Sequence, residues 1–246
     1  MVKSIVLGIV LSFGVLISGA FCAEYTVGVE AIDYTPFYSS QGGDYVGFGR
    51  DLLDLFAEKQ GCRFVYKPLP VKRLFSSFLN KSIDFKFPDH PNWQMGMKKG
   101  KDVVYSQPIL QTREGLMVLP ENKGKGIDHI KIIGTVMGFS PWEYMKMADS
   151  GQITLVENAN FSNLLQQVIG KRIDGAYINV TVATYHLKHE LNKSGALVFD
   201  ETLPYGKNEY HLSTIELGNM IEAFNQFLKD SAPLIQALKV KYGIDH

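Results

Sequence analysis

The sequence alternates short strand-like segments with amphipathic helical segments near its beginning. Strand-like runs occupy residues 25–29, 62–66 and 83–87, and helical spacing of apolar residues begins after Asp51 and again at Arg73. Strands that alternate with helices pair in parallel, because each helix carries the chain back across the sheet. This part of the chain is therefore predicted to form a parallel sheet covered by helices.

The middle of the chain repeats the alternation. Strand-like runs occupy 131–136, 153–156 and 175–178. A helix that opens at 138–141 and a second at 163–169 separate them, and a third helical pattern follows at 181–191. Two such units on one chain predict an α/β protein with a cleft between the units. Ligands of open α/β sheets bind beyond the carboxyl ends of the strands. The loops that follow these strands are therefore where we search for binding residues.

Residues 1–22 have the pattern of a secretory signal peptide. A short basic start precedes an uncharged apolar segment at 4–18, and small residues predominate at 19–23. The apolar run is shorter than the roughly 20 residues that a membrane-spanning helix needs, although a membrane anchor is the alternative interpretation. We expect a cleaved signal peptide and a monomeric protein in the periplasm.

Composition and missing motifs argue against several classes of function. Lys plus Arg and Asp plus Glu each number 25, so neither a nucleic acid nor an anionic membrane is expected as a partner. The sequence has no G-x-S-x-G, phosphate-loop or Cys-x-x-Cys motif, and we expect no cofactor. His186 and His189 share an expected helix without an evident third ligand. We interpret both as solvated histidines and expect no metal site.

The order of short motifs resembles family 3 of the extracellular solute-binding proteins, the periplasmic amino-acid-binding group of ABC importers. The family's first strand, Pro-Phe loop, V-G-F turn, acidic helix and closing glycine correspond here to Gly28, Pro36-Phe37, Val46-Gly47-Phe48, Asp51 and Gly61. The segments SIDFKF, VVYSQPIL, GTVMGFS and GKRIDGAYIN then follow in the family's order. The likeness covers essentially the whole chain after the expected signal peptide.

The resemblance implies an α/β, two-lobed fold of the type II periplasmic-binding-protein class. Lobe one would comprise residues 23–110 plus 204–246, and lobe two would comprise residues 111–203. Two crossover strands near 109–113 and 204–207 would form the hinge. A ligand would close the two lobes on each other.

Two positions depart from the family's pattern for binding a free α-amino acid. The family holds the ligand's carboxylate with an arginine in a T-x-x-R motif, whose guanidinium forms a bidentate clamp, and the matching region here, PDHPNWQMGMKKGKD, has no arginine. The acidic residue that holds the ammonium corresponds to Asn179, which offers a hydrogen bond but no charge. The expected ligand is an amino acid held differently, an amino-acid derivative or a small organic acid.

Ten residues are candidates for ligand binding. Most lie at strand ends, in the loops that follow them or at helix starts of the expected cleft, and the resemblance implies an aromatic contact at Tyr34 and a backbone contact at Asp89. Ser140 is the expected N-cap of a helix beginning at Pro141, and free N–H groups at a helix start bind anions. For each candidate, ordinary packing or a solvated surface position is the alternative. The candidates are Glu30, Tyr34, Arg73, Asp89, Trp93, Gly138, Phe139, Ser140, Tyr177 and Asn179.

The function that the resemblance implies is capture of a small polar solute and its delivery to the membrane permease of an ABC importer. The protein is not expected to be an enzyme. Two alternatives remain open at this stage. A cyclohexadienyl-dehydratase-like enzyme would use carboxylates such as Glu30 and Asp89, and a ligand-presenting component would act on a membrane sensor.

Overall fold

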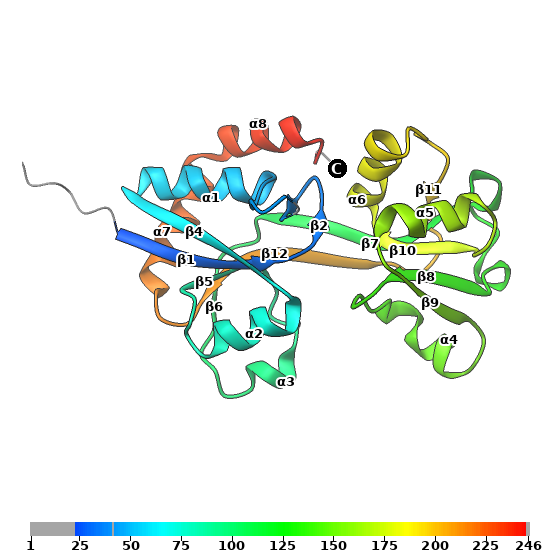
Figure 1. Ribbon diagram of the computed structural model, residues 1–246, viewed down its shortest axis with the longest axis horizontal. Coiled ribbons are helices and arrows are strands. Elements are labelled where there is room, and N and C mark those ends of the chain that lie inside the picture. Colours follow the sequence, from blue (N-terminus) through cyan, green and yellow to red (C-terminus); the bar gives the residue numbers. More distant parts are fainter. Residues whose placement is uncertain (1–22, 41, 245–246) are drawn as a thin grey trace, which may run out of the picture.

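The computed structural model describes residues 23–40 and 42–244. The expected signal peptide, residues 1–22, lies outside the described residues. The described part contains one ten-stranded sheet with the main strand order β4-β1-β5-β12-β7-β10-β8-β9, and a separate two-stranded β2-β3 ribbon. Helices cover both faces of each end of the sheet (Figure 1). The predicted α/β class is confirmed.

One end of the sheet, here called the first half, contains three parallel strands. Strand β1 (Ala23–Glu30) lies between β4 (Cys62–Leu69) and β5 (Phe85–Asp89). Helices α1 (Phe48–Lys59) and α2 (Val71–Leu79) are the crossovers between these strands and lie on opposite faces of the sheet (Figure 1). The β-α-β-α-β order predicted for this part of the chain is therefore correct.

The last two helices pack back onto the first half. In helix α7 (Gly218–Asp230), the ring of Phe224 meets Phe56 of α1 edge to face at 4.9 Å between centroids. From helix α8 (Ala232–Tyr242), the hydroxyl of Tyr242 donates a hydrogen bond to Asp51 of α1 at 2.8 Å. The apolar spacing of α1 and α7 thus builds one core from the two ends of the chain.

The other end of the sheet, the second half, repeats the arrangement. Strand β8 (Ile132–Val136) lies between β9 (Thr154–Asn158) and β10 (Gly175–Asn179), and all three are parallel. Helix α5 (Phe161–Ile169) connects β9 to β10, and helix α6 (Val180–Tyr185) follows β10. The strands predicted in the middle of the chain all form.

Two predicted helices of the second half differ from expectation. Ser140 is not an N-cap: Pro141 has a non-helical ψ of 75°, so only a 3-10 turn, η3 (Trp142–Tyr144), precedes the short helix α4 (Met145–Asp149). The helix expected at 181–191 begins at Val180, because the Asn179 side chain accepts hydrogen bonds from two backbone N–H groups of its first turn. It then widens into a π-turn, η4 (His186–Glu190).

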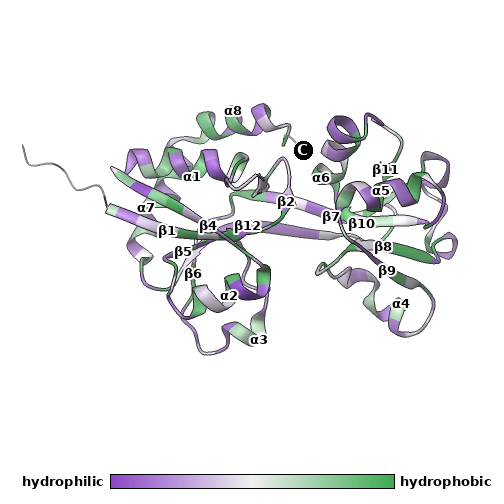
Figure 2. Cartoon of the chain, viewed as in Figure 1, coloured by the Kyte–Doolittle hydropathy of each residue, from purple (hydrophilic) through white to green (hydrophobic). Residues whose placement is uncertain are grey.

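Two long antiparallel strands join the halves. Strands β7 (Leu110–Val118) and β12 (Gly206–Thr214) pair from Gly206 with Glu114 to Tyr210 with Leu110. β12 also pairs with β5, and β7 also pairs with β10. The segments that cross between the halves are hydrophilic in Figure 2, in contrast to the strands buried within each half. The chain therefore passes between the halves along a polar, two-stranded ribbon.

The remaining elements are short. They are β2 (Asp33–Tyr34), β3 (Tyr38–Ser39), α3 (Met95–Lys98), β6 (Val104–Tyr105), β11 (Val198–Phe199) and the 3-10 turns Pro120–Asn122 and Ile127–His129. Across residues 23–40 and 42–244, no helix has the length and apolar character that a membrane crossing requires.

Candidate functional site

Three buried or partly buried carboxylates converge where the two halves meet. Glu30 ends β1, Glu114 lies on the crossing strand β7, and Glu143 lies on η3. Their charges act on one another, since Glu30 and Glu143 both raise the pKa of Glu114. Within the described residues, none of the three forms a salt bridge. We call Glu30, Glu114 and Glu143 the carboxylate cluster.

Tyrosine hydroxyls, rather than cations, hold the carboxylate cluster. Tyr38 donates a hydrogen bond to Glu30 at 2.7 Å, and Tyr177 donates one to Glu143 at 2.5 Å. Tyr34 donates a longer one to Glu114 at 3.4 Å. These three tyrosines and three carboxylates lie on β1, β2, β3, β7, η3 and β10, so both halves contribute. A hydroxyl satisfies a lone pair but leaves the negative charge uncompensated.

The pKa values of two members of this cluster, Glu30 and Glu114, are raised. Burial raises the pKa of Glu30, and the positive charge of Lys86 only partly opposes that effect. Burial and then the nearby charge of Glu143 raise the pKa of Glu114 to about 7. Carboxyl groups with raised pKa values in a cleft are typical of binding and catalytic sites. A residue that served stability alone would not need to be a carboxylate in such surroundings.

An aromatic stack connects the halves beside the carboxylate cluster. The rings of Tyr34 and Phe139 lie parallel, 5.8 Å apart with an interplanar angle of 5°. Phe161 meets both rings edge to face, at 5.6 Å from Tyr34 and 5.8 Å from Phe139. Tyr34 belongs to the first half and both phenylalanines belong to the second. The structure therefore brings together two of the predicted candidates, Tyr34 and Phe139.

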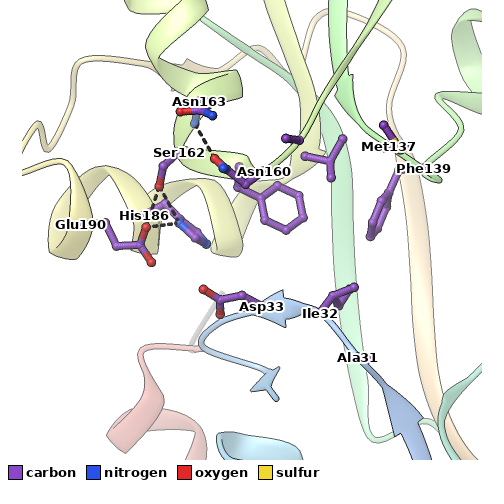
Figure 3. Close-up of a pocket in the computed structure, with 13 residues that line it drawn as sticks. Ala31, Ile32, Asp33, Met137, Phe139, Asn160, Ser162, Asn163, His186 and Glu190 are labelled. Atoms are coloured by element: carbon purple, nitrogen blue, oxygen red, sulfur yellow. Dashed lines mark hydrogen bonds and ion pairs between the residues drawn. The ribbon is translucent and has the colours of Figure 1, made fainter. Parts of the chain in front are cut away.

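A cavity of about 680 Å³ opens next to the aromatic stack. Residues 31–33 of the first half form one wall, and Phe139, residues 159–163, His186 and Glu190 of the second half form the other (Figure 3). Sites for small molecules are concave and commonly lie between two domains. Both the cavity and the carboxylate cluster thus lie between the halves.

His186 differs from the sequence-based expectation. It is 3% exposed, whereas His189 is exposed, so the interpretation of both as solvated histidines is wrong for His186. The π-turn at the end of α6 turns His186 inward, where its ring meets Phe161 at 5.6 Å. Sequence spacing alone could not show this, because a regular helix was expected at that point.

Asp89 lies in a charge cluster inside the first half rather than in the open cavity. It is fully buried and contacts Lys86 Nζ at 3.2 Å and Lys98 Nζ at 2.9 Å. Ser213 donates a further hydrogen bond at 2.7 Å. Burial alone would raise the pKa of Asp89, but the two lysines and Ser213 hold it below its usual range. We call Lys86, Asp89 and Lys98 the lysine–aspartate cluster.

The other candidates divide between buried and exposed positions. Tyr177 and Asn179 are buried at the end of β10, and Trp93 is partly buried with its ring 5.9 Å from that of Tyr210. Arg73 is exposed on α2. Gly138 and Ser140 are exposed in the turn after β8, where Gly138 has a positive φ of 89°. With no α-helix starting at Ser140, the expected helix N-terminal anion site is not formed.

Comparison with known families explains this arrangement of two halves. The family model described as bacterial extracellular solute-binding proteins, family 3, matches residues 25–239. The chain belongs to this family. The resemblance drawn from the motifs is therefore correct. No curated protein sequence matches the chain.

Solved structures show that this family 3 chain has the type II periplasmic-binding-protein fold. The ligand-binding core of GluR0 in complex with L-glutamate aligns with a TM-score of 0.71 at 14% identity, covering 91% of this chain and 99% of that chain. An arginine transport-system periplasmic binding protein from Legionella pneumophila gives 0.67 at 16% identity, with coverages of 89% and 99%.

A third structure, an ancestral amino-acid-binding protein that is a precursor of cyclohexadienyl dehydratase, gives a TM-score of 0.65 at 18% identity, with coverages of 89% and 95%. These similarities concern the fold.

Proposed function

We propose that this family 3 protein captures a small polar solute between its two halves and delivers it to the membrane permease of an ABC importer. The observation that carries the proposal is the carboxylate cluster, in which Glu30, Glu114 and Glu143 meet between the halves with tyrosine partners and no salt bridge among the described residues. A solute with a positive group would supply the missing charge.

The proposed lobes follow the crossing strands. Lobe one comprises residues 23–110 plus 204–246, lobe two comprises residues 111–203, and the hinge lies near 109–113 and 204–207. The antiparallel pairing of β7 with β12, which includes residues 110–113 and 206–207 of the proposed hinge segments, supports this division. Opening at the hinge would separate Tyr34 from Phe139 and admit the solute, since these rings come from opposite halves.

The proposed solute is an amino acid, an amino-acid derivative or a small organic acid. The carboxylate cluster favours the members of this set that carry an ammonium group over plain organic acids, because a second anion would add to the repulsion among three carboxylates. The Tyr34–Phe139 stack favours a planar or apolar part in the solute. Arg73, exposed on α2, is the candidate cation for a carboxylate at the other end of the solute.

A thermal-shift screen of ligand-stripped protein tests this proposal. The plate contains α-amino acids, amino-acid derivatives, amines and organic acids. A solute present at about 100 times its Kd adds about 2.7 kcal/mol to the free energy of unfolding, which raises the melting temperature by a few degrees. We expect hits among ammonium-bearing compounds and a weaker shift in Glu114→Gln. A plate without any hit would contradict solute binding.

Export to the periplasm is part of the proposal and has a direct test. The signal-peptide pattern of residues 1–22 predicts that the protein in a periplasmic extract begins near residue 23. Intact-mass measurement of that extract checks the cleavage, and gel filtration checks the expected monomer. A protein that stays with the cell membrane at full length would contradict cleavage.

The dehydratase alternative receives less support from the geometry. Its two proposed carboxylates have different surroundings, because Glu30 is bound by Tyr38 whereas Asp89 is paired with two lysines inside the first half. Asp89 has little left to offer a substrate, because it is fully buried and both of its carboxylate oxygens already have partners, the two lysines on one and Ser213 on the other. An assay with prephenate and arogenate is expected to show no turnover, and measurable turnover would contradict the non-enzymatic proposal.

The sensor alternative differs in the partner and not in the solute. A ligand-presenting component would bind the same solute and dock on a membrane sensor instead of a permease. Transport of the identified solute in a strain lacking this protein separates the two. Loss of uptake is expected, and normal uptake with loss of a solute-dependent response would favour the sensor.

A further inference from the structure

A second group of ionisable residues lines the wall of the cavity and shares no residue with the carboxylate cluster. Asp33, His186 and Glu190 each offer one ligand atom, and these atoms lie within 4.8 Å of one another. Asp33 belongs to β2 in the first half, and the other two residues belong to the π-turn η4 in the second half. Figure 3 shows the Asp33 carboxylate facing His186 and Glu190 across the cavity.

The imidazole of His186 indicates that this group is more than a surface ion pair. Its Nδ1 lies 2.9 Å from Glu190 Oε2, but its buried Nε2 has no hydrogen-bond partner, although the residue is only 3% exposed. A buried ring nitrogen without a partner costs free energy unless something binds there. His186 is one of the residues that line the cavity.

The two carboxylates are already oriented by neighbouring hydroxyl groups. The hydroxyl and the backbone N–H of Thr35 both donate to Asp33 Oδ1. Ser162 Oγ donates to Glu190 Oε2 at 2.6 Å and lies 3.3 Å from His186 Nδ1. Outer hydrogen bonds of this kind fix the direction of metal ligands in known sites. The group therefore has both the inner residues and the supporting residues of a metal site.

The geometry points to a site for a divalent transition-metal ion, bound by Asp33, His186 and Glu190 across the two halves. One imidazole and two carboxylates suit Zn²⁺ and related ions, whereas Ca²⁺ and Mg²⁺ prefer oxygen ligands alone. Ligand atoms around tetrahedral Zn²⁺ lie about 3.4 Å apart, as its bond lengths of about 2.0–2.2 Å require. The three ligand atoms lie within 4.8 Å of one another, so side-chain adjustments of about 1 Å bring the group to that spacing.

An ion at this position would act as a clamp between the halves, because its ligands come from both. Three protein ligands leave a coordination position open for water or for a group of a solute in the cavity. This inference goes beyond solute capture. It needs neither the carboxylate cluster nor an identified solute, so its test is independent of the proposed function.

Isothermal titration of the untagged, chelator-treated protein with Zn²⁺ alone tests the site. We expect one ion per chain, and we expect Asp33→Asn and Glu190→Gln each to weaken binding on the order of 10- to 100-fold. His189→Gln is the matched control, because His189 lies on the same π-turn, is exposed and is outside the group. It should bind Zn²⁺ as the native protein does. Circular dichroism melts establish that the variants are folded.

Three results would overturn the inference. The first is no saturable Zn²⁺ binding. The second is an equal loss of affinity in His189→Gln, which would indicate binding to surface histidines. The third is native affinity in Asp33→Asn, which would remove the contribution of the first half. As a separate check of the clamp, small-angle scattering should show a smaller radius of gyration with Zn²⁺ in the native protein and no change in Asp33→Asn.

Discussion

The lysine–aspartate cluster and the carboxylate cluster are both largely buried, but only the first balances its carboxylate with cations. In the first, Lys86 and Lys98 surround Asp89, and the pKa of that carboxyl is lowered. In the second, Glu114 lies near two further carboxylates without a cation, and its pKa is raised to about 7. The charge of Asp89 is balanced by cations of the protein itself, whereas the charge of Glu114 is not.

The difference helps to separate structural residues from binding residues. A buried charge whose hydrogen-bonding positions are all occupied by protein groups serves the fold and has no free position for a solute. Buried carboxylates that have only uncharged hydrogen-bond partners destabilise the fold, and this cost falls when a cation binds. The location agrees with this distinction, since the lysine–aspartate cluster lies within one half and the carboxylate cluster lies between two.

The largest effect on stability should come from a substitution in the lysine–aspartate cluster. Asp89→Asn leaves the two lysine charges without their carboxylate partner, and we expect the free energy of unfolding to fall by about 3–5 kcal/mol. Urea denaturation at neutral pH measures it. The control is Glu216→Gln, which breaks the exposed pair with Lys81 and should cost less than about 1 kcal/mol. Equal losses in both variants would show that burial does not distinguish the pairs.

Neutralising Glu114 in the carboxylate cluster should change how the free energy of unfolding depends on pH. The pKa of Glu114 is 4.5 ordinarily and about 7 in the folded protein. The folded state therefore holds a proton that the unfolded state has lost, so this residue lowers stability as pH rises from 4.5 to 7. In Glu114→Gln that decrease, about 3 kcal/mol at most, should disappear.

Urea denaturation of the native protein and of Glu114→Gln between pH 4 and pH 8, without solute, measures this difference. Contributions from other titrating groups largely cancel in the comparison. If the two stability curves run parallel across this range, the carboxylate cluster does not carry an uncompensated charge.

A smaller effect is expected at Asn179, which is paired in register with Glu114. Asn179→Ala removes the N-cap of α6 and should cost about 1 kcal/mol. Asn160→Ala removes the N-cap of α5 and is the matched control for the loss of stability only, because Asn160 also lines the cavity. Asn179 Nδ2 has no hydrogen-bond partner, so if Asn179 also binds the solute, Asn179→Ala should bind it more weakly than the native protein does. Native affinity in Asn179→Ala would limit Asn179 to capping.

The smallest effect on stability should come from Arg73. It is exposed on α2, so Arg73→Ala should change the free energy of unfolding by no more than about 0.5 kcal/mol. Its predicted effect is on the solute: affinity should fall about tenfold, which corresponds to about 1.4 kcal/mol. Lys72→Ala, an exposed neighbour on the same helix, is the control. Unchanged affinity in Arg73→Ala would remove it from the proposed site.

Local pattern was sufficient to predict most of the fold. The strands around β1 and β8 were predictable from apolar runs, and α1 and α7 from helical spacing, because each of these signals depends on residues close in sequence. The helix that the sequence predicted to begin at Pro141 does not begin there. Pro141 suggested the first position of a helix, but its ψ of 75° delays the helical turn.

Side-chain clusters were harder to predict because they join distant segments. Glu30 was a candidate as a strand-end residue and Tyr34 was a candidate through the resemblance. Nothing in the sequence near Glu114 or Glu143 indicates that these two carboxylates would lie beside them. Lys86 is fully buried in a strand where an apolar residue would be usual. Asp33 and His186 lie close together only because the first half and the second half are in contact there. A pattern within one segment cannot show which carboxylates will lack a cation once folded.

The crossing ribbon has a consequence for the order in which this protein can be made. β12 lies next to β5 in the sheet of the first half, yet it is synthesised after every strand of the second half. A chain that grows from its N-terminus can therefore assemble β8, β9 and β10 before the first half has all of its strands. The half that begins the sequence is the last to be finished.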